Sequence, residues 1–66
     1  MTRPRAELSS ITSTLADLNE RVTALAERSR DGGEADLAAE LFAIERDLRG
    51  ALRRLARASS ERSPRT

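Results

Sequence analysis

Residues 28–37 read RSRDGGEADL, and their glycine pair separates two stretches with a helical repeat of apolar residues. Glycine costs a helix about 1 kcal/mol relative to alanine, and it readily adopts the left-handed conformation that ends many helices. We expect Gly32 to end a first helix in that conformation, and Gly33 or Asp31 to cap a second one. The segment is either a tight turn within one hairpin or a linker between two independent helices.

The residues before the glycine pair predict a long amphipathic helix. Apolar side chains recur at alternating steps of three and four residues: Leu8, Ile11, Leu15, Leu18, Val22 and Leu25. This is the a/d repeat of a coiled-coil seam, with Leu8 at a and Ile11 at d. Pro4 suits a first helical turn, because its missing N–H would have no intrahelical acceptor there. The first helix is predicted from about residue 4 to about residue 30.

The residues after the glycine pair repeat the pattern. Apolar positions follow at Leu37, Leu41, Ile44, Leu48, Ala51 and Leu55, with d at 37, 44 and 51 and a at 41, 48 and 55. A second helix is predicted over about 34–58, after a turn at about 31–33. Gly50 falls at a c position, and we interpret it as a tolerated surface glycine. Residues 1–58 are therefore predicted to form the hairpin and residues 59–66, SSERSPRT, a flexible basic tail.

The register of the two repeats favours a hairpin over a linker. Antiparallel helices pair a residues with d residues at a constant sum of residue numbers. The pairs that sum to 66 are Leu25 with Leu41, Val22 with Ile44, Leu18 with Leu48, Leu15 with Ala51, and Ile11 with Leu55. Their centre is residue 33, within the glycine pair. The flanking g positions agree, because Arg28 faces Glu40 and Arg21 faces Asp47 with opposite charge.

A lone hairpin of this size is expected to be marginally stable. A chain of 66 residues buries little apolar surface by itself. The predicted fold is therefore all-α, an antiparallel, coiled-coil-like two-helix hairpin that pairs into a dimeric four-helix bundle. The surface offered for pairing is the e/b flank, where side chains are small and largely uncharged. Its predicted interface residues are Thr12, Ala16, Ala26, Ala35, Ala38, Phe42, Leu52 and Ala56.

Phe42 is the one aromatic residue of the chain. It lies about 130° from the centre of the predicted seam, at 100° per residue, so the seam of a lone hairpin cannot cover it easily. One interpretation is a scattered exposed apolar side chain. The other, which we favour, is an anchor at the interface between two hairpins.

The composition argues against enzymatic and metal chemistry. The chain has no Cys and no His, which removes disulfides, the usual zinc and iron ligands, and the Cys–His and Ser–His pairs of nucleophilic catalysis. No enzyme activity and no cofactor are predicted. No apolar run approaches the roughly 20 residues of a membrane span, and the start, MTRPRAEL, lacks the apolar region of a signal peptide. We therefore expect a cytoplasmic protein.

Charge is divided along the predicted rod. Residues 1–16 and 47–66 hold eight arginines and three acidic residues, a net +5, whereas residues 17–46 hold four arginines and eight acidic residues, a net −4. The end that carries both termini is therefore basic, and the turn half is acidic. Two hairpins packed in opposite directions would bring unlike charges together, which favours an antiparallel twofold dimer.

The predicted function is that of a small, non-enzymatic protein-interaction module. It is expected to form a homodimer and to bind another protein, as an adaptor, a small subunit or a regulator of the anti-sigma type. The alternative is a nucleic-acid-binding hairpin dimer that uses its arginine-rich end. The candidate contacts to an anionic partner are Arg3, Arg5, Arg49, Arg53, Arg54 and Arg57. No stacking aromatic residue or recognised motif accompanies them.

Overall fold

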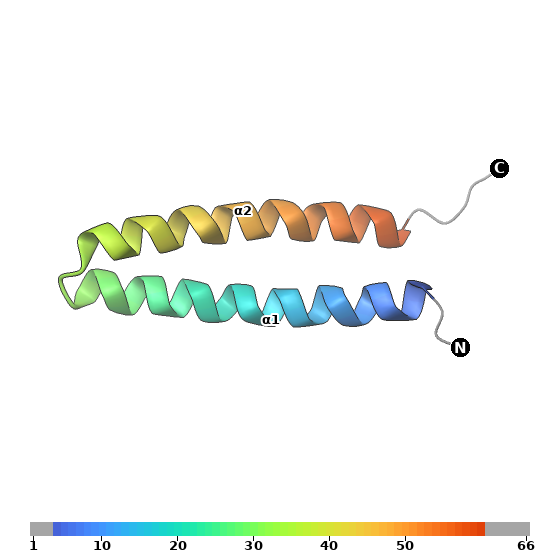
Figure 1. Ribbon diagram of the computed structural model, residues 1–66, viewed down its shortest axis with the longest axis horizontal. Coiled ribbons are helices and arrows are strands. Elements are labelled where there is room, and N and C mark those ends of the chain that lie inside the picture. The colour runs from blue at the N-terminus through green and yellow to red at the C-terminus, as the bar shows by residue number, and fades with distance from the viewer. Residues whose placement is uncertain (1–3, 61–66) are drawn as a thin grey trace.

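The computed structural model describes residues 4–60 and consists there of two helices. Helix α1 (Pro4–Asp31) and helix α2 (Ala35–Ser60) lie side by side and antiparallel (Figure 1). The predicted all-α hairpin is confirmed. Helix α1 begins at the expected proline, and α2 continues two residues beyond the predicted end. Arg3 and residues 61–66 of the predicted tail lie outside the described residues.

A short turn joins the helices, and its hydrogen bonds explain where α1 ends. The Glu34 amide donates to the Ser29 carbonyl at 2.8 Å, and the Gly33 amide donates to the Arg30 carbonyl at 3.2 Å. These two bonds form a Schellman motif, which requires a left-handed residue at the position of Gly33. Gly33 indeed has φ of 86°. The prediction that Gly32 adopts this conformation was therefore wrong by one residue.

The start of α2 also differs from the prediction. The Glu34 carbonyl accepts the first hydrogen bond of α2, from the Ala38 amide at 2.9 Å. Glu34 thus occupies the capping position that we assigned to Gly33 or Asp31. Asp31 is instead the last residue of α1. The turn is one residue later than its sequence suggested, because Gly32 still follows the helical path and its amide donates to the Arg28 carbonyl at 2.9 Å.

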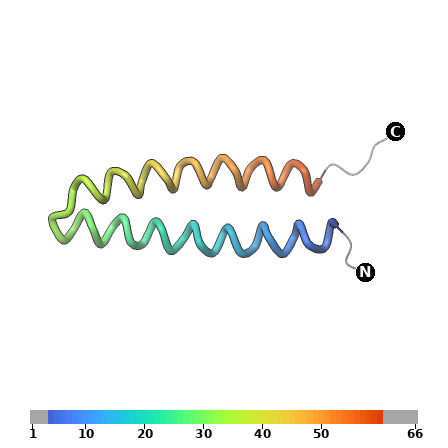
Figure 2. Tube along the Cα trace, in the orientation of Figure 1, coloured from blue at the N-terminus to red at the C-terminus, as the bar shows by residue number. Residues whose placement is uncertain are grey.

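The hairpin is a rod one layer thick, measuring 52 × 23 × 11 Å. Both described ends lie together, opposite the turn (Figure 2). There the Arg5 guanidinium donates from Nη1 to the Ser59 carbonyl at 2.9 Å, so the helices remain joined at the end far from the turn. Because a single layer has solvent on both faces, no large side chain among residues 4–60 is fully buried.

The contact between the helices is rotated away from the predicted seam. The buried apolar residues are two alanines, Ala26 at 0% exposure and Ala38 at 3%. Both occupy e positions, and Ala26 is flanked along α1 by two further buried residues, Asn19 at e and Ser29 at a. The a leucines are half-buried. The predicted a/d packing was therefore wrong: the helices meet along e, with a on one side and b on the other.

The two buried alanines at e explain the rotation. An alanine has no side chain beyond Cβ, so two helices can approach closely where alanines face each other. Two threonines beside this contact satisfy their hydroxyls locally: Thr12 donates to the Leu8 carbonyl at 2.8 Å, and Thr23 donates to the Asn19 carbonyl at 3.1 Å. The rotation also turns the g positions outward. Within the described residues, neither Arg28 with Glu40 nor Arg21 with Asp47 forms the expected ion pair.

Candidate interaction surfaces

The rotation leaves the d side chains on the surface. Five large apolar residues are exposed, by 39% to 50% of their area: Ile11, Leu18, Leu25, Leu37 and Ile44. All five occupy d positions of the predicted repeat. Leucine and isoleucine at strict helical spacing are expected to face a packing partner. In this hairpin they face solvent.

The d side chains of both helices lie on the same face of the hairpin. The helices of an antiparallel pair are related by an approximate twofold axis normal to the plane that contains them, so equal heptad positions project to the same side of that plane. The half-buried a residues lie between the two d rows. We call this surface the a/d face: Leu8, Ile11, Leu15, Leu18, Val22 and Leu25 of α1, with Leu37, Leu41, Ile44, Leu48, Ala51 and Leu55 of α2.

The a/d face has shallow hollows and a charged border. One hollow on α1 is lined by Ile11, Leu15 and Leu18 with two hydroxyl residues, and a second extends from Leu18 to Leu25. Arg21 and Arg28 line the border of the second hollow. On α2 the corresponding g positions hold Glu40, Asp47 and Arg54. An apolar centre with a polar rim is the usual composition of a protein-binding surface.

The e/b flank, predicted as the interface between hairpins, contributes mostly to the contact within one hairpin. Ala26 and Ala38 are buried between α1 and α2, so they have no surface left for a second hairpin. The other members are half-buried, namely Thr12, Ala16, Phe42 and Leu52, or exposed, namely Ala35 and Ala56. These residues follow the line along which α1 and α2 of the same chain pack against each other.

Phe42 is half-buried at the edge of the helix contact. The guanidinium of Arg30 lies over its ring, with Cζ 5.9 Å from the ring centroid. At this distance a cation–π attraction contributes about 0.5–1 kcal/mol at an exposed site. Arg30 also donates from Nε to Asp31 Oδ1 at 3.3 Å. Phe42 therefore already has a partner within its own hairpin, and it lies on the side of the rod opposite the a/d face.

Two polar residues, one in each helix, occupy e positions near the middle of the rod. Asn19 is buried, and its Oδ1 has no hydrogen-bond partner among the described protein atoms. Glu45, at an e position of α2, has 12% of its side chain exposed and accepts hydrogen bonds from Arg49 Nε and Nη2 at 3.1 and 2.6 Å. A buried acceptor without a donor costs about 1–3 kcal/mol. The unpaired Oδ1 of Asn19 therefore weakens the helix contact.

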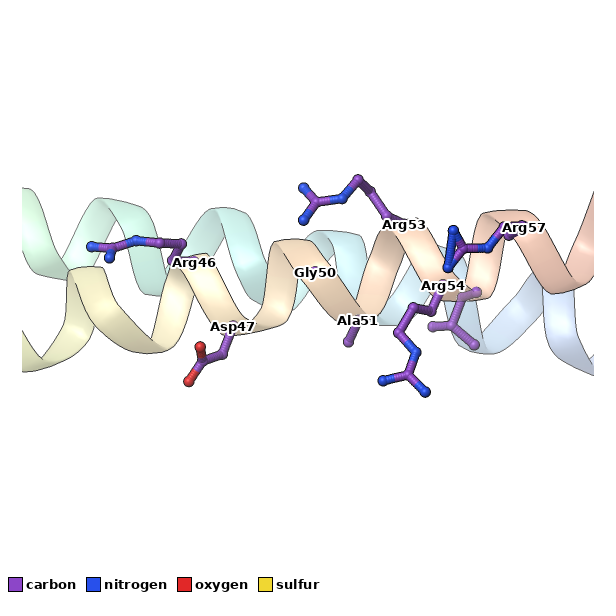
Figure 3. Close-up of a pocket in the computed structure, with 8 residues that line it drawn as sticks. Arg46, Asp47, Gly50, Ala51, Arg53, Arg54 and Arg57 are labelled. Carbon is purple, nitrogen blue, oxygen red and sulfur yellow. The ribbon is translucent and has the colours of Figure 1, made fainter.

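The arginines predicted to contact an anionic partner differ in their surroundings. Arg5 binds the Ser59 carbonyl, and Arg49 pairs with Glu45. Arg53, Arg54 and Arg57 line a shallow, open depression on the outer side of α2, together with Arg46, which the sequence reasoning did not select. Figure 3 shows Arg46, Arg53 and Arg57 on one side of Gly50 and Asp47 and Arg54 on the other. Residues 46, 50, 53 and 57 are spaced by four, three and four residues, which places them on one face of a helix. This spacing could have identified Arg46 from the sequence.

Comparisons with known proteins add no functional information. No family model, curated protein or solved structure matches the chain. Within residues 4–60, no cluster of three or more His, Cys, Asp or Glu side chains could hold a metal ion. Neither described helix combines the length and apolarity needed to cross a bilayer. The surfaces described above are therefore the basis for a function.

Proposed function

We propose that this chain is a non-enzymatic helical-hairpin protein-interaction module that self-associates through its a/d face into a dimeric four-helix bundle. In that role it would act as an adaptor, a small subunit or a regulator of the anti-sigma type, with a second protein as its target. The observation that carries the proposal is the row of five exposed d side chains. They are the large apolar side chains that are exposed among residues 4–60.

Energetics support a partner on this face. Fully burying a leucine or isoleucine contributes about 1.5–3 kcal/mol, so covering side chains that are already half-buried contributes about 1 kcal/mol each. Two hairpins together offer ten such d residues, or on the order of 10 kcal/mol before the costs of association are subtracted. The described part of the hairpin buries only two alanines and carries an unpaired polar atom at its centre. Association would supply the core that each hairpin lacks.

Sedimentation equilibrium on matched variants tests the proposal. Leu18→Glu places a charge at the middle of the a/d face, where burial without a partner is costly, and we expect a monomer. Ser13→Glu adds the same charge at an exposed f position and should leave the dimer intact. Phe42→Glu changes the opposite side of the rod and should also leave it intact.

Two outcomes would overturn this assignment. A dimer that survives Leu18→Glu but dissociates in Phe42→Glu would move the interface to the e/b flank. A wild-type chain that is fully helical by circular dichroism and monomeric at about 100 μM, a concentration well above a micromolar Kd, would remove self-association altogether.

Nucleic-acid binding is the second candidate, and the arginine-lined depression on α2 favours it. Within the described residues, the lining of this depression holds Arg46, Arg53, Arg54 and Arg57 and a single acidic residue, Asp47. Arg46, Arg53 and Arg57 extend from positions outside the a/d face, so a dimer formed through that face would leave them accessible. Arg54 lies at the border of the a/d face, and the depression is also lined by Ala51 and Leu55 of that face. Guanidinium groups bind phosphate oxygens bidentately, so a cluster of arginines suits a nucleic-acid backbone.

A gel-retardation assay with duplex and single-stranded nucleic acid across salt concentrations distinguishes the candidates. Phosphate contacts predict binding that weakens steeply as salt rises, by a log–log slope of about −0.9 for each phosphate neutralised on B-DNA. An Arg53→Ala/Arg57→Ala variant should lose part of that slope. Absence of a shift at low salt would reject nucleic acid and leave protein binding as the function.

A further inference from the structure

We infer that the partner of the a/d face is a second copy of this chain lying in the opposite direction, with α1 packed on α1 of the other copy and the two Leu18 side chains meeting at the twofold axis. This inference rests on the proposed self-association and adds its orientation and contacts. Two hairpins that face each other through their a/d faces have two symmetric arrangements. They differ in whether the turns lie at the same end or at opposite ends.

Symmetry fixes which helices meet in each arrangement. With the turns at the same end, the twofold axis runs along the rod, and α1 of one copy lies directly over α2 of the other. With the turns at opposite ends, the axis runs across the rod, and α1 lies directly over α1 of the other copy. The two arrangements therefore place different d residues in contact, and the contacts identify the orientation.

The d positions of α1 are compatible with the opposite-end arrangement. Helix α1 runs from Pro4 to Asp31, and Leu18 lies at its middle. Ile11 and Leu25 lie on either side of Leu18 at equal sequence distance. The distance from Ile11 to the start of α1 is almost the same as the distance from Leu25 to its end. When the second copy is turned end over end, Leu18 meets Leu18 and Ile11 meets Leu25. All three contacts join large apolar side chains.

The charges favour the same orientation. Among the described residues, the half with the turn, 17–46, holds four arginines and eight acidic residues, a net −4. The other half, residues 4–16 and 47–60, holds five arginines and two acidic residues, a net +3. The sign changes at residues 17 and 46, at the height of Leu18. Opposite-end packing places each acidic half on a basic half, whereas same-end packing places like charges together.

Salt dependence of the dimer tests the orientation without any substitution. Raising NaCl from about 10 mM to about 100 mM shortens the screening length from about 30 Å to about 10 Å. Sedimentation equilibrium of the wild type should show a dissociation constant that rises several-fold over this range, because attraction between unlike halves is screened. A dissociation constant that falls with salt would indicate like halves in contact and would overturn the orientation.

Cross-linking tests the contacts directly, and the absence of cysteine from the sequence makes each introduced thiol unique. We expect a short bismaleimide to link Leu18→Cys to its own copy. A mixture of Ile11→Cys and Leu25→Cys should give the linked heterodimer, identified by mass, in several-fold excess over either homodimer. Ser13→Cys, at an outward f position, is the control and should give no linked dimer.

These experiments distinguish a wrong orientation of the dimer from an absence of self-association. If sedimentation shows a dimer but Ile11→Cys and Leu25→Cys each link only to themselves, self-association stands and the opposite-end orientation is wrong. If sedimentation shows a wild-type monomer and no variant cross-links, self-association fails and the orientation fails with it.

Discussion

The e rows and the d rows of this hairpin have opposite environments. The e rows contain the two buried alanines, and they hold α1 against α2. The d rows contain large leucine and isoleucine side chains, and 39% to 50% of the area of five of them is exposed. The larger side chains contribute less to the hairpin than the smaller ones. Close approach of the backbones at small side chains, rather than burial of large ones, therefore decides which face closes the hairpin.

The e and d positions of the same heptad repeat therefore fit two different kinds of helix packing. A contact lined by small residues fits a pair of helices at short distance, whereas a face of leucine and isoleucine fits the wider interior of a bundle. In a four-helix bundle each helix has two neighbours, so its apolar stripe points between them. The hairpin has one neighbour for each helix, and the d rows show where the second neighbour would lie.

The largest expected effect comes from filling the e contact. Ala38 is 3% exposed between the helices, so Ala38→Leu should force them apart and lower the free energy of unfolding by about 3 kcal/mol. Ala39→Leu, one position further along at an exposed f site, should change it by less than about 0.5 kcal/mol. Thermal unfolding followed by circular dichroism at matched concentrations measures both.

The outcome of this pair decides between the two packing arrangements. If Ala38→Leu were tolerated as well as Ala39→Leu, the helices would not meet along e, and the a/d seam read from the sequence would be restored. Equal loss in both variants would instead point to a general effect of leucine on α2.

The sequence determined the existence, direction and approximate limits of the helices, because periodicity and the glycine pair act locally. The constant sum of the paired residue numbers identified the hairpin, because its midpoint, residue 33, falls within the glycine pair of the turn. The rotation of the helices was not predictable in the same way. It depends on the balance between burying Leu18 and Ile44 and bringing Ala26 and Ala38 into contact, and this balance is a property of both helices together.

A smaller loss of stability is expected from substitutions in the turn that joins α1 and α2. Gly33 has φ of 86° with open space where a Cβ would lie, so Gly33→Ala should cost about 1–2 kcal/mol through backbone strain alone. Gly32→Ala is the matched control. Its Cβ would lie 3.2 Å from the Arg28 carbonyl oxygen, but its backbone conformation is an ordinary one, and we expect a smaller loss. Urea unfolding of both variants ranks them. A larger loss at Gly32 would contradict the Schellman assignment.

The candidate surfaces were only partly predictable, because they depend on the rotation of the two helices. The residues of the a/d face were all identified from the repeat, but they were assigned to the interior of the hairpin. Phe42 and the alanines of the e/b flank were assigned to the surface between hairpins, because a seam along a and d leaves them uncovered. Arg46 was missed because the arginines were selected by their nearness to the chain ends rather than by their common face.

A gain in stability is expected where a polar residue interrupts the e row. The buried Oδ1 of Asn19 has no partner among the described residues, so Asn19→Ala removes an unpaired acceptor and extends the alanine contact. We expect the free energy of unfolding to rise by about 1 kcal/mol. Asn19→Asp retains the size but places a charge without a partner at a buried position, so it should be destabilising. Denaturant titration checks both. A loss in Asn19→Ala would mean that the amide makes a favourable contact in the folded chain.

The smallest expected effect is at Gly50, on the side of α2 that neither the e contact nor the a/d face uses. A Cβ at this position would meet only Arg53 Nη2, at an ordinary contact distance of 3.7 Å. Gly50→Ala should therefore raise the free energy of unfolding by up to about 1 kcal/mol, the difference between glycine and alanine inside a helix. Ala43→Gly, at the preceding c position, is the matched reverse change and should lower it by a similar amount. Because both residues lie outside the a/d face, neither variant should change the fraction of dimer in sedimentation once the helices are fully folded. If Gly50→Ala weakened the dimer while Ala43→Gly did not, a partner helix would have to approach the backbone at Gly50, and the interface would extend across the arginine-lined side of α2.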